Sequence, residues 1–217
     1  LAEAGFRVVL GARRLDRLAE VAERCGGRAL PLDVTDQASV DAFAAAVPHC
    51  SVLVNNAGGA LGTDLVAGAS VEDWQWMYDV NVLGTLRMTR ALLPALLASG
   101  DGQVITIGSI AAREAYRGGA GYNVAKHGVA ALTRVLRIEL LGQPIRVCEI
   151  DPGMVQTEFS LVRFRGDAQA ADAVYAGVEP LTAKDVAETV AFVATRPSRV
   201  NFDQILMLAR DQSSAQV

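Results

Sequence analysis

Residues 51–59 read Ser-Val-Leu-Val-Asn-Asn-Ala-Gly-Gly, a short apolar run that ends in amide side chains and glycines. The run from Ser51 to Asn55 is typical of a strand buried on both faces, and the glycines after it predict a turn. Similar β-branched runs recur along the chain and alternate with longer segments of helical period. This alternation predicts a doubly wound α/β fold, in which a parallel sheet carries helices on both faces.

The sequence divides into short β-branched segments and longer amphipathic ones. The predicted strands are Arg7–Ala12, Arg28–Leu32, Ser51–Asn55, Gln103–Gly108, Ile145–Ile150 and Ile205–Leu208. The predicted helices are Leu15–Arg24, Asp36–Ala46, Ser70–Ser99, Gly121–Leu141 and Thr182–Thr195. Residues 159–180 are expected to be irregular or loosely helical. No repeat or low-complexity linker interrupts the chain, so we expect one domain over residues 1–217.

The composition excludes several classes of function. The net charge of −4 does not favour a nucleic acid or an anionic membrane as a partner. No apolar run approaches the roughly 20 residues of a membrane span, and no N-terminal stretch is typical of a signal peptide. An odd set of cysteines (Cys25, Cys50 and Cys148) predicts a reducing, cytoplasmic location and no disulfide framework. Because His49 and His127 lie far apart in the sequence, no metal site is expected.

Ser109, Tyr122 and Lys126 form the strongest chemical pattern in the sequence. Tyr122 and Lys126 are four residues apart, so they share one face of a helix. A phenol is a poor base at neutral pH, and a nearby ammonium is expected to lower its pKa. The pair is therefore suited to moving a proton on or off an alcohol oxygen. Ser109 ends a predicted strand, where its hydroxyl can bind the same oxygen.

Tyr-x-x-x-Lys also occurs on ordinary helix surfaces, so its context decides its meaning. Asn55 to Gly58 follow one predicted strand, Ser109 ends another, and Pro152-Gly153 ends a third. In open α/β sheets, ligands bind where the carboxyl ends of the strands meet. These residues are therefore expected to surround one site.

Together, these motifs resemble the short-chain dehydrogenases/reductases over essentially the whole chain. The matching motifs are Asn55-Asn56-Ala57-Gly58, Asn81-Val82-Leu83-Gly84, Ser109, Tyr122-Asn123-Val124-Ala125-Lys126 and Pro152-Gly153-Met154-Val155-Gln156-Thr157. The resemblance implies a Rossmann-type fold and a catalytic tetrad of Asn81, Ser109, Tyr122 and Lys126. It implies that Tyr122 exchanges the proton and that Ser109 orients the substrate oxygen. Lys126 would hold the nicotinamide ribose, and Asn81 would interrupt its helix and support a water relay.

Arg13 and Arg14 point to the choice of cofactor. In this fold an acidic residue after the second strand selects NAD, whereas an arginine there suits the 2′-phosphate of NADP(H). Here Arg13-Arg14 follows the strand and no acid occurs before Asp16, which predicts NADP(H). Solvated surface arginines are the alternative. The resemblance implies further cofactor contacts from Asp33, Val34, Asn55, Ala57, Gly58, Tyr122, Lys126, Pro152, Gly153, Val155 and Thr157.

The start of the sequence departs from the family pattern. Leu1 to Gly5 is typical of the end of a helix with Gly5 as its C-cap, and no Gly-rich phosphate loop precedes it. The family's first strand, which lies between its second and fourth, has no counterpart. We expect a break in the sheet at that position, with unpaired backbone groups on both sides. This predicts a longer protein or a truncated gene product.

The segment 159–180 corresponds to the family's substrate lid. Its sequence, with Arg199-Val200-Asn201, resembles the serine or 3-hydroxy acid dehydrogenase branch. This implies oxidation of a small β-hydroxy acid, or reduction of the matching carbonyl acid. Candidate carboxylate binders are Arg113, Arg117, Arg163 and Arg165, although each is also compatible with a solvated loop arginine.

Two other functions are compatible with the sequence. One is a broad-specificity carbonyl or quinone reductase, and the other is a truncated, non-catalytic subunit that pairs with intact copies. The long helices 70–99 and 121–141 carry extra apolar residues. In the family the matching helices form a dimer interface, which implies a homodimer or homotetramer.

Overall fold

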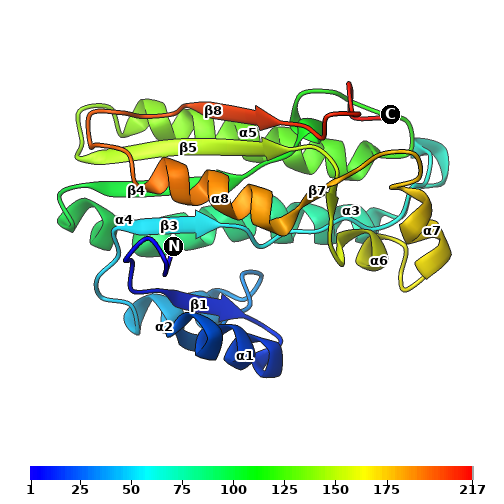
Figure 1. The fold of residues 1–217 in the computed structure, drawn as a ribbon. Coiled ribbons are helices and arrows are strands. Elements are labelled where there is room, and N and C mark those ends of the chain that lie inside the picture. Colours follow the sequence, from blue (N-terminus) through cyan, green and yellow to red (C-terminus); the bar gives the residue numbers. More distant parts are fainter. Residues whose placement is uncertain (217) are drawn as a thin grey trace.

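The central sheet has four parallel strands in the order β3-β4-β5-β8. They are β3 (Val52–Asn55), β4 (Gly102–Ile107), β5 (Ile145–Pro152) and β8 (Gln204–Met207). Figure 1 shows the arrowheads of β3, β5 and β8 at the same end of the molecule. The structure, a computed structural model, describes residues 1–216.

Two smaller sheets accompany the central one. β1 (Val9–Ala12) pairs in parallel with β2 (Arg28–Pro31), and β6 (Val155–Gln156) pairs with β7 (Leu181–Thr182). Every strand predicted from the sequence is present, with its ends within two residues of the predicted ones. The short β6–β7 pair was not predicted, because two-residue strands leave no periodic signal.

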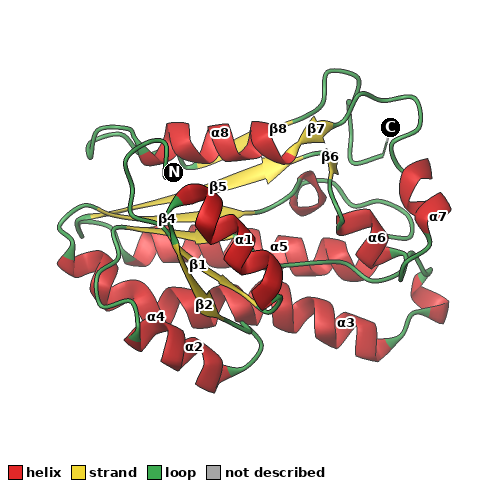
Figure 2. Ribbon diagram, turned by 60° about the horizontal axis from the view of Figure 1, so that its bottom comes forward, coloured by secondary structure: helices red, strands yellow, loops and turns green. Residues whose placement is uncertain are grey.

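Helices cover both faces of the central sheet, as the alternating sequence pattern predicts. Figure 2 shows α8 on one side of the strands and α4 and α5 on the other. The α-helices are α1 (Leu15–Cys25), α2 (Gln37–Ala45), α3 (Val71–Tyr78), α4 (Gly84–Ala98), α5 (Ala120–Glu139), α6 (Phe159–Arg163), α7 (Ala168–Ala173) and α8 (Ala183–Ala194). The doubly wound α/β fold is therefore confirmed.

The two faces of β4 belong to different hydrophobic cores. Val104 packs in a cluster with Leu92 and Leu96 of α4, whereas Ile105 packs in a second cluster with Val193 of α8. Neighbouring residues of a strand point to opposite faces, so adjacent apolar residues bury both surfaces of the sheet. This explains why the central strands are continuous apolar runs.

The predicted helix 70–99 is interrupted in its middle. α3 ends at Tyr78, a π-helical segment spans Asp79–Leu83, and α4 begins at Gly84. Asn81 lies in the π segment, so the implied break at this residue is present. Such wide turns are frequent at functional sites. Ser70 caps α3 by accepting a hydrogen bond from the Asp73 backbone N–H at 3.1 Å.

Two irregular segments lie outside the main layers. The predicted helix end at Leu1–Gly5 is a hydrogen-bonded turn, in which Gly5 has a φ of 89°. Residues 159–180 form the short helices α6 and α7 joined by turns, in agreement with the loosely helical prediction. Figure 1 shows both helices beyond the carboxyl ends of the strands.

Within residues 1–216, β1 and β3 belong to separate sheets and are not paired. This is the predicted break in the sheet. A cavity of about 2690 Å³ lies between the two strands and continues to the carboxyl ends of the central strands. The β1–β2 unit is nonetheless tied to the rest of the fold, because Val9 and Leu30 pack against the core formed by α2 and α4.

The burial of each leucine predicts how much its side chain stabilises the fold. Leu96 of α4 is fully buried, whereas Leu15 at the start of α1 is 54% exposed. Leu96→Ala should lower the free energy of unfolding by about 2–5 kcal/mol, through lost burial and an unfilled cavity. Leu15→Ala should change it by less than about 1 kcal/mol. Urea unfolding of both variants provides the measurement, and equal losses would contradict this assignment of the core.

Candidate active site

The carboxyl ends of the central strands surround the large cavity. All the residues that the sequence predicts to bind the cofactor line it: Arg13, Arg14, Asp33, Val34, Asn55, Ala57, Gly58, Tyr122, Lys126, Pro152, Gly153, Val155 and Thr157. Ser109 lines the same cavity, whereas Asn81 reaches it only through its contact with Gly59. The tertiary structure therefore brings the predicted residues to one place.

Ser109 follows β4 and Gly108 at the point where the chain leaves the sheet. Its side chain caps the short 3₁₀ helix Ile110–Ala112 by accepting a hydrogen bond from the Ala111 N–H at 3.1 Å. Its own N–H donates to Asp151 Oδ1 at 3.0 Å. These contacts hold Ser109 in place, the first through its hydroxyl oxygen and the second through its backbone.

Tyr122 lies in the first turn of α5 and is buried. Its ring is 5.4 Å from the Phe159 ring between centroids. Burial raises the pKa of Tyr122 above its usual range, while a hydrogen bond with Ser109 and the charge of Arg163 oppose this shift. The direction is opposite to the lowering predicted from the spacing of Tyr122 and Lys126, because desolvation outweighs the attraction of nearby cations. Tyr122 therefore carries its proton at neutral pH.

Lys126 lies one helical turn beyond Tyr122, as the spacing predicts. Its Nζ donates to the Ile107 carbonyl at 2.9 Å and lies 5.8 Å from the centroid of the Tyr122 ring. Burial lowers the pKa of Lys126 to about 8, although Asp151 and Glu149 act in the opposite direction. At neutral pH the side chain is thus mainly an ammonium close to Tyr122.

Asn81 anchors the loop that follows β3. Its Nδ2 donates to the Gly59 carbonyl at 2.8 Å and to the Met77 carbonyl at 2.7 Å, and its Oδ1 accepts from the Gly59 N–H at 3.3 Å. A Cβ on Gly58 would lie 2.5 Å from Asn81 Oδ1 and 3.8 Å from Lys126 Nζ. A glycine at position 58 therefore lets Asn81 and Lys126 approach the same stretch of backbone.

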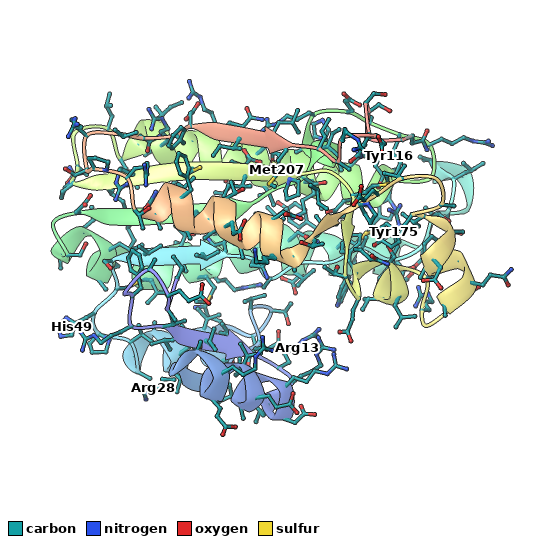
Figure 3. All side chains as sticks on the ribbon, in the orientation of Figure 1. Arg13, Arg28, His49, Tyr116, Tyr175 and Met207 are labelled. Atoms are coloured by element: carbon teal, nitrogen blue, oxygen red, sulfur yellow. The ribbon has the colours of Figure 1, made fainter. Side chains whose placement is uncertain are left out.

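An ion-pair cluster joins two segments of the predicted cofactor site that lie far apart in the sequence. Arg14 Nη1 lies 2.8 Å from Glu158 Oε2, and Arg17 Nη1 lies 2.5 Å from Glu158 Oε1. Hydrogen bonds from these two arginines lower the pKa of Glu158 to about 2. Sequence reasoning missed Glu158 and Arg17, because the partners are more than 140 residues apart. Figure 3 shows Arg13 at the arrow end of β1.

Asp33 and Val34 occupy the loop after β2. Asp33 Oδ1 accepts hydrogen bonds from the Thr35 N–H at 2.9 Å and the Thr35 hydroxyl at 2.7 Å. These bonds, with a smaller contribution from Arg13, lower the pKa of Asp33. Val34 is buried against Gly84, where an added Cβ would meet its side chain at 2.7 Å. The loop is thus held by local hydrogen bonds and by contact with α4.

The side chain of Arg163 in α6 contacts two loops beside the site. It donates to the Tyr116 hydroxyl at 3.0 Å and to the Gly62 carbonyl at 3.1 Å, and its guanidinium lies 5.6 Å from the Tyr116 ring centroid. The Tyr175 hydroxyl of the segment after α7 meets Ser160 Oγ at 2.8 Å. Figure 3 shows Tyr116 and Tyr175 at the same end of the molecule.

The four arginines proposed as carboxylate binders have different surroundings. Arg113 is bound to Asp151 and Glu149, and Arg165 is paired with Asp73 at 2.6 Å. Arg117 and Arg163 both line the large cavity. The charge of Arg163 also acts to lower the pKa of Tyr122, against the larger effect of burial. Because the guanidinium of Arg113 already binds two buried carboxyl groups, its assignment as a substrate contact is not supported by its geometry.

Residues 1–216 contain neither a disulfide nor a cluster of metal-ligand side chains. Cys25, Cys50 and Cys148 are free thiols, and the described part of the chain contains no cluster of three or more ligand-type side chains suited to a metal ion. His127 Nδ1 meets the Asn123 carbonyl at 2.8 Å. None of the described helices has the length and apolar character of a membrane span.

With this geometry in place, comparison with known proteins decides the family. Residues 1–166 match the family model of the short chain dehydrogenases. The chain belongs to this family. As a short-chain dehydrogenase, the protein is an oxidoreductase. It is 62% identical over 215 residues to an uncharacterized oxidoreductase of Mycobacterium tuberculosis (strain ATCC 25618 / H37Rv), and the match covers 99% of this chain and 86% of the relative.

Two further relatives of this short-chain dehydrogenase have more specific names. An NADP-dependent 3-hydroxy acid dehydrogenase of Schizosaccharomyces pombe is 40% identical over 222 residues, covering 98% of this chain and 86% of the relative. The closed form of a serine dehydrogenase complexed with NADP+ has a TM-score of 0.95 and 39% identity, covering 100% of this chain and 90% of the other. The resemblance to the serine and 3-hydroxy acid dehydrogenase branch is therefore confirmed.

Proposed function

We propose that this short-chain dehydrogenase uses NADP(H) to interconvert a small β-hydroxy acid and its carbonyl form, with Tyr122 as the acid/base. The observation that carries the proposal is the proximity of Ser109, Tyr122 and Lys126: the Tyr122 hydroxyl interacts with Ser109, and Lys126 Nζ lies 5.8 Å from the centroid of the Tyr122 ring. The cofactor-type residues border the same cavity. A hydroxyl pair beside a buried ammonium is suited to binding and protonating one substrate oxygen.

Tyr122 and Ser109 act on the substrate oxygen in this proposal. During reduction Tyr122, which burial keeps protonated, donates its proton to the carbonyl oxygen and becomes a phenolate. During oxidation the phenolate form of Tyr122 takes the proton from the alcohol and becomes a phenol again. Ser109 donates a hydrogen bond to the same oxygen and so stabilises the negative charge that develops on it. The hydrogen bonds from the Ala111 N–H to Ser109 Oγ and from the Ser109 N–H to Asp151 fix the position of Ser109 and support this role.

Lys126 and Asn81 complete the proposed tetrad. The Lys126 ammonium stabilises the phenolate that Tyr122 becomes after giving up its proton. Asn81 would support a water relay to Lys126, and their common approach to Gly58 is compatible with that role. The π segment that contains Asn81 sets its side chain toward the loop after β3.

NADP(H) fits the residues that line the cavity. When bound, it supplies the hydride that moves between C4 of the nicotinamide and the carbinol carbon. Arg13 and Arg14 would hold its 2′-phosphate, because guanidinium groups pair well with phosphate oxygens. Glu158 already forms an exposed ion pair with Arg14. This pairing supports Arg14 as a position where an anionic group binds and can be replaced by another.

The remaining contacts follow the family pattern. Asp33 and Val34 would lie against the adenine, and Val155 and Thr157 would bind the nicotinamide carboxamide. Tyr122 and Lys126 would hold the nicotinamide ribose. The other lining residues that we assign to the cofactor are Asn55, Ala57, Gly58, Pro152 and Gly153.

The proposed substrate is small and anionic. Relatives of this chain include a serine 3-dehydrogenase and a sulfoacetaldehyde reductase, at 38% and 40% identity. Serine, 3-hydroxy acids and sulfoacetaldehyde all carry an acid group close to the reacting oxygen or its carbon. Arg163 is our candidate for binding that group, because it lies near Tyr122 and comes from the lid segment 159–180.

The organisation of the protein remains a proposal as well. We propose one domain over residues 1–217, a cytoplasmic location, and a homodimer or homotetramer. Exposed apolar side chains on α5 and just beyond it support an interface between copies: Val124, Val135, Ile138 and Leu141.

Tyr122→Phe tests the chemistry. It removes the proton donor and keeps the buried ring, so kcat should fall by about 10²- to 10⁴-fold. NADPH binding, measured by fluorescence, should change little. Tyr78→Phe removes a hydroxyl from an exposed tyrosine and serves as the control. Turnover by Tyr122→Phe at the rate of the control would refute Tyr122 as the acid/base.

Arg14→Gln tests the choice of cofactor. Loss of a charge-assisted bond to the 2′-phosphate should raise the KM for NADPH by roughly 10- to 100-fold, while the KM for NADH stays unchanged. Arg17→Gln is a matched control, because Arg17 also binds Glu158 but does not belong to the predicted phosphate site. A similar loss for both cofactors would contradict the assignment.

Arg163→Gln tests the substrate class. The variant should raise the KM for a small hydroxy acid by about tenfold, since one charged hydrogen bond is lost. The KM for a neutral alcohol of similar size should hardly change. Arg24→Gln alters an exposed arginine on α1 as the control. Equal effects on acid and neutral substrates would favour the broad-specificity carbonyl reductase instead.

A further inference from the structure

Two buried carboxyl groups lie directly behind Ser109. Glu149 and Asp151 are two residues apart on β5, so they project from the same face of the strand. Glu149 is 4% exposed and Asp151 is fully buried. Buried acids of this kind are rare unless they are paired or serve a function, and neither is part of the proposed tetrad.

Asp151 connects four segments of the fold at one point. Its Oδ1 accepts the Ser109 N–H at 3.0 Å. Its Oδ2 accepts from Arg113 Nε at 2.9 Å, from Arg113 Nη2 at 2.8 Å and from Gln204 Nε2 at 2.7 Å. Oδ2 is thus saturated with donors, whereas among the described residues Oδ1 accepts one hydrogen bond, from the backbone of a proposed catalytic residue.

Glu149 is satisfied on one side only. Its Oε2 accepts from Arg113 Nη2 at 2.8 Å, whereas Oε1 is buried and has no hydrogen-bond partner among the described residues. If both acids were ionised, the cluster of Arg113, Glu149 and Asp151 would carry one net negative charge, and among the described residues neither acid forms an ion pair with Lys126. A proton on Glu149 removes that charge and gives Oε1 a hydrogen to donate.

We propose that Glu149 and Asp151 share one proton, and that Glu149 is a positioning residue which sets the charge behind Ser109, Tyr122 and Lys126. The inference rests on the proposed function, because it acts through those residues. Glu149 itself touches neither the substrate nor the cofactor in this scheme.

The charged surroundings of Glu149 are few. Arg113 comes from the loop after β4 and Asp151 from the same strand, while Lys126 faces the pair from α5. Gln204 of β8 is uncharged. The carboxylate of Asp203, next to β8, is instead paired with two arginines of α5, Arg134 and Arg137.

These surroundings bring the pKa of Glu149 close to neutral pH. Burial and the charge of Asp151 raise the pKa of Glu149 to about 7, against the opposing effect of Arg113. Above that pH Glu149 loses its proton and adds a negative charge near Lys126. The added charge offsets that of the Lys126 ammonium, which then stabilises the Tyr122 phenolate less. Tyr122 becomes a weaker acid and carbonyl reduction slows.

Glu149→Gln tests this inference, because glutamine keeps the shape and the donor group but cannot ionise. In the wild-type enzyme, kcat/KM for NADPH-dependent reduction should fall by roughly three- to tenfold as the pH rises through about 7. The variant should match wild type below that pH and exceed it above. Glu139→Gln alters an exposed acid at the end of α5 and should follow the wild-type profile. A variant that keeps the wild-type inflection would overturn the proposal.

An infrared measurement keeps the test independent of activity. The wild-type protein should show a protonated carboxyl C=O band that disappears as the pH rises through neutrality, and Glu149→Gln should lack it. Presence of the same band in the variant would overturn the proposal even if its turnover were poor. Tyr122→Phe separates the two ideas: full turnover in that variant refutes the proposed function, whereas loss of turnover with an unchanged Glu149→Gln profile refutes only the inference.

Discussion

The parallel pairing of β4 with β5 is the constraint on which the site depends. In this register Thr106 lies opposite Glu149 and Ile107 opposite Ile150, so the chain leaves β4 beside the end of β5. Ser109 then donates its N–H to Asp151, and the Ile107 carbonyl accepts from Lys126. A shift by one residue would turn these side chains to the opposite face and separate Ser109 from its support.

Burial of this site acts on every ionisable group in it, and always against the charged form. It raises the pKa of Tyr122 and Glu149 and lowers that of Lys126. Tyr122 therefore carries its proton at neutral pH, and the nearby ammonium matters most after the proton has left. Desolvation disfavours an isolated charge, but it also strengthens the interaction between two charges. The attraction of Lys126 for a Tyr122 phenolate and of Arg113 for the two acids is therefore stronger here than in water.

The large cavity separates two parts of the fold that must cooperate. The β1–β2 unit carries Arg13 and Arg14, while the central sheet carries Ser109, Tyr122 and Lys126. Glu158 links them, since it precedes α6 and forms ion pairs with Arg14 and Arg17. In the proposed function, a 2′-phosphate at Arg14 would compete with Glu158, so cofactor binding and the position of α6 would depend on one ion pair.

The sequence by itself determined the layered α/β fold, most element boundaries, and the residues that gather at the strand ends. It could do so because strand and helix periods are local, and because the Tyr122–Lys126 spacing follows from a single helix. The break at Asn81 came from the family resemblance, since the local pattern predicted one continuous helix over residues 70–99. Only the tertiary structure decided the direction of the Tyr122 pKa, the use of Arg113 by Asp151 and Glu149, and the pairing of Arg14 with Glu158. Those properties depend on desolvation and on contacts between distant segments, which no local spacing encodes.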